Sequence, residues 1–141
     1  YCLDARSGRA KWKFAADGNL LVAAHPLLAV LKATPAGKIL WEASGQPQGG
    51  ADAVEFGEPR DLALDSKGNV WVADRQRNEV VCLSADGKLV CRYGKYANVD
   101  DTEGKGFDGP TGVAVTQVDG AEYLYVGDAG NQRLVKYRLA W

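Results

Sequence analysis

The chain has 141 residues, of which 46% are hydrophobic and 25% charged, and its formal net charge is −1. This composition indicates a folded globular chain and excludes a disordered one, and the balanced charge gives no broad basic surface for nucleic acid or an anionic membrane. No apolar run reaches the ~18 residues that a membrane-spanning helix needs.

Short runs rich in Val, Leu, Tyr and Trp alternate with glycine turns along the whole chain, which predicts an all-β fold without long helices. In the first unit we expect strands at residues 12–15, 20–23, 28–33 and 38–43. In the second unit we expect strands at residues 61–65, 70–73, 79–84 and 88–93. In the third unit we expect strands at residues 112–115, 123–126 and 133–139, and no fourth strand is evident before the chain reaches Trp141.

The first unit allows a second arrangement. Residues 2–14 could form a hairpin, because Cys2-Leu3-Asp4 resembles Cys82-Leu83-Ser84. We prefer the first arrangement, because too few residues separate Phe14 from Gly18 to hold another strand.

Two stretches, residues 56–74 and 107–128, are versions of one another. Four-stranded meanders repeated every ~40–50 residues are typical of β-propeller blades. A β-sandwich is the alternative fold, but it would not require the same strand–turn–strand order three times. We expect blades at about residues 8–43, 57–93 and 107–141, and residues 1–7 as a possible edge strand for another blade.

The third unit, with Phe107-Asp-Gly-Pro-Thr-Gly-Val-Ala-Val followed by Leu-Tyr-Val-Gly-Asp-Ala-Gly-Asn-Gln-Arg, resembles an NHL repeat. The second unit matches less fully, with Asn78 corresponding to the Asn131 of the third and Asp61 in place of the usual glycine. The first unit keeps only the turn glycines and has Ala24 in place of the aspartate. The resemblance implies about half of a six-bladed ring. It indicates fold more than function, because NHL-type propellers bind proteins, RNA or small ligands and some relatives are enzymes.

Half of a ring would expose two apolar blade faces and unpaired strand edges. We therefore expect that the chain is not a stable monomer. Residues 1–4 of one copy could pair with residues 133–139 of another, head to tail, to give a closed dimer or an open filament. Alternatively the remaining blades belong to a longer chain, and the absence of methionine suggests a processed protein or a piece of one.

In a four-stranded meander, the loops between the second and third strands and between successive blades share one face. We place the partner surface on this face, because it carries the long loops at residues 44–57 and 94–109. The candidate binding residues, for an anion or an acidic partner, are Arg60, Arg75, Arg77 and Arg133, although pairing with carboxylates would equally explain them. The residues expected to hold loops through local hydrogen bonds are Asp74, Asn78, Asp128 and Asn131.

No metal or cofactor is expected, and no catalytic motif is present. His25 is the single histidine and is interpreted as a loop residue. Residues 98–104 are rich in oxygen ligands, but Glu103 stands where a calcium-binding EF-hand loop needs glycine. The hypothesis is a non-catalytic binding or self-assembly module, secreted or periplasmic, with a possible protein ligand. The alternatives are a fragment of a propeller lyase or lactonase with its catalytic residues outside this chain, and an RNA-binding NHL domain.

The three cysteines are an odd number, which argues against a fully paired disulfide framework. Cys82 and Cys91 should lie on adjacent antiparallel strands. A two-residue turn would place them directly opposite one another, whereas a three-residue loop at Ala85-Asp86-Gly87 with a bulge would turn them to opposite faces. We expect the three-residue loop and free thiols.

Overall fold

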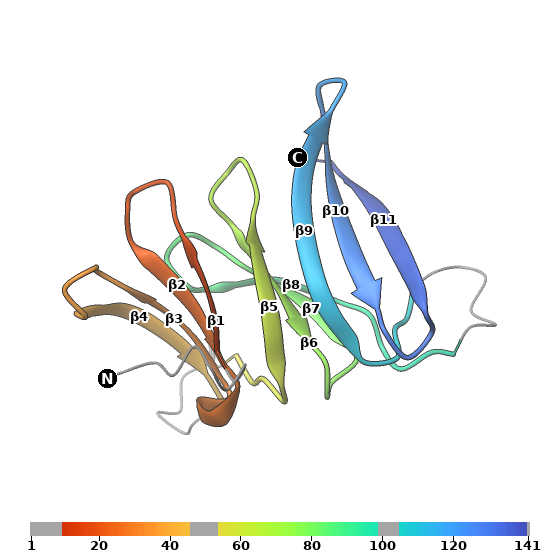
Figure 1. The fold of residues 1–141 in the computed structure, drawn as a ribbon, viewed down its shortest axis with the longest axis horizontal. Coiled ribbons are helices and arrows are strands. Elements are labelled where there is room, and N and C mark those ends of the chain that lie inside the picture. The colour runs from red at the N-terminus through yellow and green to blue at the C-terminus, as the bar shows by residue number, and fades with distance from the viewer. Residues whose placement is uncertain (1–9, 46–53, 99–104, 141) are drawn as a thin grey trace.

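The computed structural model describes residues 10–45, 54–98 and 105–140. Figure 1 shows that its strands form three twisted sheets standing side by side like an opened fan. The strands are β1 (Ala10–Phe14), β2 (Leu20–Ala24), β3 (Ala29–Ala33), β4 (Ile39–Ser44), β5 (Pro59–Leu64), β6 (Val70–Asp74), β7 (Glu79–Leu83), β8 (Leu89–Tyr93), β9 (Pro110–Val118), β10 (Ala121–Asp128) and β11 (Arg133–Leu139).

Each sheet is an antiparallel meander in chain order, which confirms the predicted strand arrangement. We refer to β1–β4 as blade 1, β5–β8 as blade 2 and β9–β11 as blade 3. In blade 1, Phe14 pairs with Leu20, so the preferred arrangement of the first unit is confirmed. The suggested strand at residues 1–4 lies outside the described residues.

Blade 3 has three strands within the described part of the chain, in the order β11-β10-β9. Its inner hairpin is longer than those of the other blades, because β9 and β10 continue to the turn at Asp119 and Gly120. The outer edge of β11 therefore has no neighbouring strand among these residues.

The hydrophobic core lies between the blades. One cluster joins blades 1 and 2 and includes Leu21, Val30, Leu62, Val72 and Val81. A second cluster joins blades 2 and 3 and includes Trp71, Val80, Phe107, Leu124 and Val126. The strands β6 and β7 are buried along their whole length, because blade 2 is covered on both faces.

Polar contacts at the turns reinforce the junctions between blades. The Trp41 indole Nε1 of blade 1 donates to the Ala85 carbonyl oxygen in the β7–β8 turn, at 3.0 Å. At the next junction, the backbone N–H of Ser66 donates to the Glu122 carboxylate at 2.8 Å. Each contact pairs a group on one blade with a turn or strand of the next, so it also helps to fix the register between blades.

Cys82 and Cys91 are both free and lie on β7 and β8. The β7–β8 loop is the expected three-residue one: Ser84 N–H donates to the Lys88 carbonyl oxygen, and Gly87 adopts a φ of 84°. The prediction that this loop turns the cysteines to opposite faces is wrong. A register shift between Cys82 and Leu83 skips Val90 and brings Cys91 opposite Cys82.

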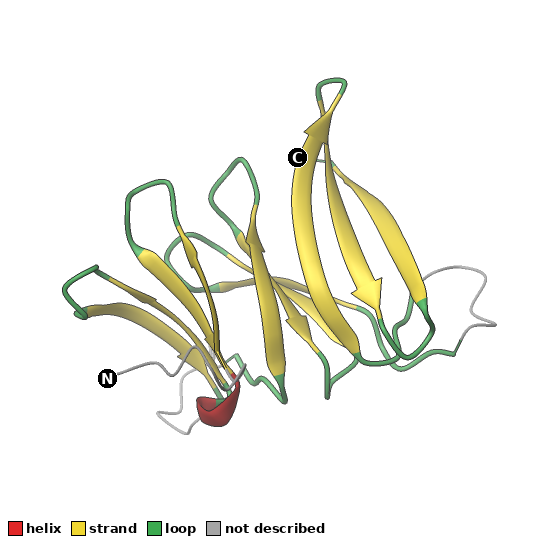
Figure 2. Ribbon diagram, in the orientation of Figure 1, coloured by secondary structure: helices red, strands yellow, loops and turns green. Residues whose placement is uncertain are grey.

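The single helix among the described residues is a 3-10 turn of three residues, His25–Leu27. Figure 2 shows this short helix at the loop edge of blade 1, with strands making up the rest of the regular structure. The prediction of an all-β fold is therefore confirmed for the described chain. Within those residues there is no helix long and apolar enough to cross a membrane.

Candidate functional site

Three loops of equal length form one edge of the fan, which we call the loop face. They join the second and third strands of each blade, at residues 25–28, 75–78 and 129–132. The fourth residue of each loop adopts a left-handed conformation: Leu28 has a φ of 49°, Asn78 of 56° and Gln132 of 52°. Asn78 therefore corresponds to Gln132, and its expected correspondence to Asn131 is wrong. Arg77 occupies the position of Asn131.

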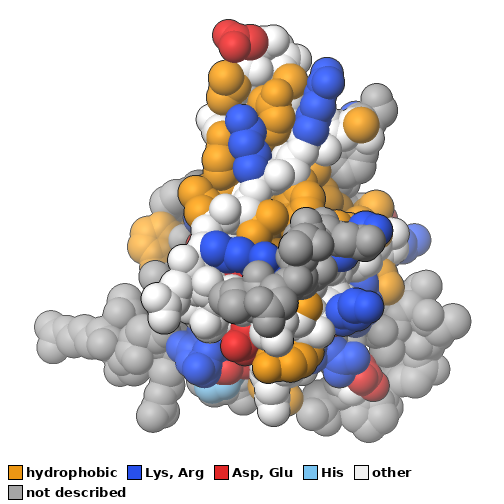
Figure 3. Space-filling model, turned by 90° about the vertical axis from the view of Figure 1, so that its right-hand side faces the viewer, with side chains coloured by type: hydrophobic (Ala, Val, Ile, Leu, Met, Phe, Trp, Pro, Cys, Tyr) orange, Lys and Arg blue, Asp and Glu red, His pale blue; other side chains and the backbone are white. Residues whose placement is uncertain are grey.

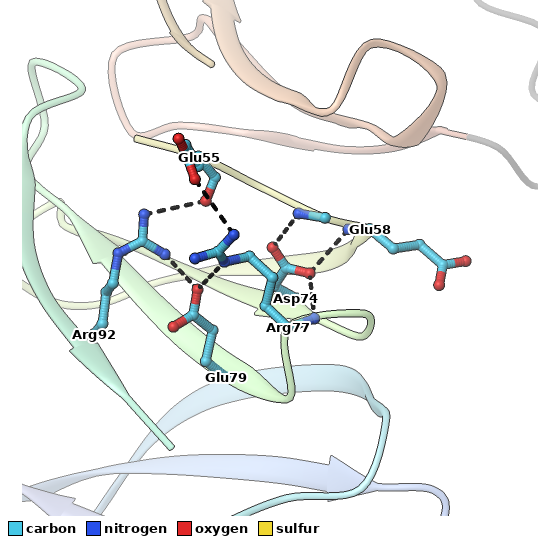
Figure 4. Close-up of polar contacts among 7 residues, drawn as sticks. Glu55, Glu58, Asp74, Arg77, Glu79 and Arg92 are labelled. Atoms are coloured by element: carbon cyan, nitrogen blue, oxygen red, sulfur yellow. Dashed lines mark hydrogen bonds and ion pairs between the residues drawn. The ribbon is translucent and has the colours of Figure 1, made fainter. Parts of the chain in front are cut away.

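Asp74 is buried at the end of β6 and ties the loop of blade 2 to the segment that enters the same blade. Its carboxylate accepts hydrogen bonds from the backbone N–H groups of Gly57 at 2.7 Å, Glu58 at 2.8 Å and Arg77 at 3.2 Å (Figure 4). Three charge-assisted bonds to backbone donors hold both segments in one geometry.

Asp128 has the same position in blade 3. Its Oδ1 accepts from the Asp108 N–H at 2.7 Å, and its Oδ2 accepts from Asn131 Nδ2 and Arg133 Nε, each at 2.8 Å. Blade 1 has Ala24 at this position and lacks the carboxylate. We call each of these buried carboxylates, with its hydrogen bonds to the loop and to the entering segment, a clamp. The Asp74 clamp and the Asp128 clamp occur in the two blades that resemble the NHL pattern.

The two asparagines connect the loops to neighbouring segments. Asn78 Oδ1 accepts from the Gly109 N–H at 2.8 Å, which joins the loop of blade 2 to the entry of blade 3. Asn131 Nδ2 also donates to the Ala97 carbonyl oxygen at 2.8 Å. Both side chains therefore act on loop geometry in this structure.

The four candidate arginines lie on the loop face, and each contacts a carboxylate. Arg60 and Arg75 both pair with Glu58, with Arg75 Nη1 at 3.1 Å from Glu58 Oε2. Arg133 pairs with Asp128 and also donates to the Gly106 carbonyl oxygen at 2.9 Å. The predicted arginines are thus brought to one face, but not as a set of uncompensated charges.

Arg77 belongs to a larger network, which sequence reasoning missed. Figure 4 shows Arg77 and Arg92 converging on Glu79, a buried carboxylate at the start of β7. Arg77 Nε lies 3.0 Å from Glu79 Oε1, and Arg92 also donates to the Glu55 backbone carbonyl at 3.1 Å. The sequence signal was Glu79, which begins β7 as Arg133 begins β11: the sign of the charge is inverted between the two blades, and the partners of Glu79 are basic.

An open depression of about 460 Å³ lies on the loop face, where segments of all three blades meet. Its lining is polar and consists of His25, Glu58, Arg75, Gln76, Asn78, Asp108 and Gly109. His25, in the 3-10 turn and not in an irregular loop, has its Nε2 at 3.7 Å from Glu58 Oε1. Glu58 thus lies among His25, Arg60 and Arg75.

No group of three or more His, Cys, Asp or Glu side chains comes together in the described residues in a way that could hold a metal ion. The oxygen-rich stretch at residues 98–104 falls almost wholly outside them.

Residues 56–83 match the family described as NHL repeat. No curated protein matches the chain. Among solved structures, a protein of unknown function from Bacteroides thetaiotaomicron is similar, with a TM-score of 0.71 and 19% identity over 92% of this chain and 34% of its own. Virginiamycin B lyase from Staphylococcus aureus gives a TM-score of 0.58 and 15% identity over 100% of this chain and 45% of its own.

A third similar structure is an auxiliary nutrient binding protein from Bacteroides thetaiotaomicron, with a TM-score of 0.62 and 15% identity over 89% of this chain and 36% of its own. The chain spans less than half the length of these three proteins. At such identities the likeness shows the fold: the chain consists of β-propeller blades and corresponds to about half of a six-bladed ring, and residues 56–83 match an NHL repeat.

Proposed function

We propose that these propeller blades form a non-catalytic binding module whose loop face takes polar, uncharged groups of a ligand, such as hydroxyls or amides. The observation that carries the proposal is the depression of about 460 Å³ to which all three blades contribute. Loops held by a rigid frame are where binding residues concentrate, and here the Asp74 and Asp128 clamps supply the rigidity.

The charges around the depression favour an uncharged ligand. Arg60 and Arg75 supply two positive charges, and Glu58 and Asp108 supply two negative ones. An anion would have to compete with Glu58 for the guanidinium groups and would approach Asp108 as well. Hydroxyl and amide groups both donate and accept hydrogen bonds. They can therefore bind to the carboxylates and the guanidinium groups around the depression without displacing an ion pair.

A similar fold in an auxiliary nutrient binding protein supports a binding role for such blades. The similarity to a lyase at 15% identity carries no catalytic residue to this chain. The other two hypotheses, an enzyme fragment and an RNA-binding domain, gain no specific support on the loop face, where each arginine named above contacts a carboxylate.

The proposal is tested by thermal unfolding of the chain with a panel of probes: glucose, galactose and N-acetylglucosamine against inorganic phosphate and citrate. A ligand at ten times its Kd stabilises the fold by about 1.4 kcal/mol, which raises the Tm of a chain of this size by about 3–6 °C. We expect a neutral probe to raise the Tm of the wild-type chain by this amount, and we expect no such rise for Gln76→Ala. Gln117→Ala, on an exposed strand position of blade 3, is the matched control. A rise with citrate that Arg75→Ala abolishes would instead indicate an anion site.

A further inference from the structure

Cys82 and Cys91 lie directly opposite one another on the neighbouring antiparallel strands β7 and β8. The Cα atoms of such partners are about 4.5–5.5 Å apart, and the Cα atoms of a disulfide are usually about 4.4–6.8 Å apart. The backbone of blade 2 therefore already has the spacing that a disulfide between these residues needs. Both strands belong to one four-stranded sheet, so this spacing involves no contact with another blade.

The two thiol groups also lie on the same face of this sheet, because direct partners on adjacent strands project to the same side. Cys82 belongs to the core cluster between blades 2 and 3, so this face is the one toward blade 3. Burial raises the pKa of both thiols, and the hydrogen bond that the Cys82 thiol donates to the Cys91 sulfur favours the thiolate of Cys91. The two sulfurs are thus neighbours in the reduced chain.

The fold does not require cysteines at these two positions. Blade 1 has the same register shift between its third and fourth strands, and there the partners are Lys32 and Trp41. Packing in the core accounts for Cys82, which is 0% exposed, but it does not account for Cys91, which is exposed. Chemistry between the two thiols explains the pair better than packing does.

We propose that Cys82 and Cys91 form a redox-active pair, which closes to a disulfide by exchange with a low-molecular-weight disulfide and opens again when thiols reduce it. The closed pair joins the edge strand β8 to β7 beside the register shift, where the regular ladder between the two strands is interrupted. This inference does not depend on the loop-face function proposed above.

The exposures of the two thiols set the order of the steps. Cys91 is accessible to a dissolved disulfide such as oxidised glutathione, whereas Cys82 is buried. The Cys91 thiolate attacks one glutathione sulfur, which forms a mixed disulfide and releases one glutathione. The Cys82 thiolate then attacks the Cys91 sulfur and releases the second glutathione. Two protein thiols are oxidised to one disulfide, one oxidised glutathione is reduced to two thiols, and these thiols take up the two protons.

The charge on the blade 3 side of the molecule suits such an oxidant. Figure 3 views the molecule from this side, where Lys and Arg side chains are prominent. Oxidised glutathione carries a net negative charge at neutral pH, and a positive potential raises the local concentration of an anion.

The test is incubation of the native 141-residue chain with oxidised glutathione, followed by blocking of the remaining thiols, trypsin digestion and mass spectrometry. Trypsin cleaves after Arg77, Lys88 and Arg92, so residues 78–88 and 89–92 separate unless a disulfide joins them. We expect the joined peptides to be the main product, and dithiothreitol to separate them. Two free thiols, glutathione retained on Cys91, or a main product that links Cys2 to either peptide would each overturn the proposal.

A matched control places the second thiol on the other face of β8. Leu89→Cys combined with Cys91→Ala keeps one exposed cysteine on this strand, but Leu89 pairs with Leu83, which belongs to the core cluster on the opposite side of blade 2. We expect at least about tenfold less peptide joined through Cys82, because side chains that point apart cannot be bridged without backbone movement. Cys82→Ala should retain glutathione on Cys91. Equal joining in the control and in the wild type would contradict a pair defined by the strand register.

Discussion

The carboxylate of Asp61 accepts a hydrogen bond from the backbone N–H of Val113, 3.1 Å away, and so joins the first strand of blade 2 to the first strand of blade 3. Asp61 stands where the NHL pattern has glycine, the residue that blade 3 keeps as Gly112. The aspartate that replaces the usual glycine therefore makes a contact between blades, and this contact lies on the inner edge of the fan.

Replacing Asp61 tests how much this contact stabilises the fold. Asp61→Ala leaves the Val113 N–H without its charged acceptor, and we expect the free energy of unfolding to fall by about 1–3 kcal/mol. Asp61→Asn keeps an oxygen acceptor and should cost less than about 1 kcal/mol. Urea denaturation measures both variants, and equal losses for the two would argue that the hydrogen bond is unimportant.

Among the carboxylates of the loop face, Asp74 should be the one whose replacement lowers the free energy of unfolding most. Asp74→Ala removes the acceptor of three backbone N–H groups at a fully buried position, and we expect a loss of about 2–4 kcal/mol. Asp119→Asn, at an exposed turn whose left-handed backbone asparagine tolerates, is the control and should change little. A small effect of Asp74→Ala would mean that water replaces the carboxylate.

The sequence was sufficient to predict the strands and their order, because alternating apolar residues and turn glycines report local geometry directly. The sequence comparison aligned Asn78 with Asn131, because both residues are asparagines. In the structure Asn78 corresponds to Gln132, because these two residues share the positive φ at the end of their loops. The register shift that brings Cys91 opposite Cys82 was also missed. Residues 88–93 contain no glycine or proline that would mark a bulge there.

The candidate site was predictable only in part. Loop positions in the repeat were enough to place Arg60, Arg75, Arg77 and Arg133 on one face. Their partners depend on which strands become neighbours in space, and Arg92 reaches Glu79 from an adjacent strand 13 residues away along the chain. Ion pairing of this kind depends on the tertiary structure. The sequence alone therefore could not decide whether these arginines are unpaired or are paired with carboxylates.

A pair of glycines offers an internal comparison of packing. Gly87 and Gly37 occupy equivalent turns with φ of 84° and 87°, but a methyl group on Gly87 would lie 2.7 Å from the Trp41 ring, and one on Gly37 would meet nothing within 4 Å. Gly37→Ala should cost about 1–2 kcal/mol from left-handed backbone strain alone. Gly87→Ala should cost about 2 kcal/mol more, because overpacking adds to that strain. Denaturant titration of both variants gives the difference, and equal costs would show that Trp41 moves aside freely.

Alkaline pH should destabilise the fold through a buried thiol. Burial, with the neighbouring Cys91 and Asp65 charges, raises the pKa of Cys82 to about 12 from the ordinary 9.0. The unfolded chain releases this proton first, so the thiol's contribution is complete below pH 9 and is lost as the pH rises from 9 toward 12. Burial also raises the pKa of Tyr137, which adds in the same direction above pH 10.

The check on the thiol is urea denaturation at pH 8 and pH 10.5 for the wild type and for Cys82→Ala. We expect stability to fall more steeply with pH in the wild type. Cys91→Ala serves as the comparison at the exposed partner. Identical pH slopes in the wild type and Cys82→Ala would exclude Cys82 as the source.

The two-sided burial of β6 and β7 has a consequence for how the chain opens. Every pair of strands among the described residues is a hairpin within one blade, so no strand ladder in this part of the chain crosses between blades. Blades 1 and 3 can therefore detach one at a time, while blade 2 keeps its hydrogen bonds until the whole chain unfolds. Hydrogen exchange of the backbone amides should therefore be slowest in the strands of blade 2 and faster in the strands of blades 1 and 3.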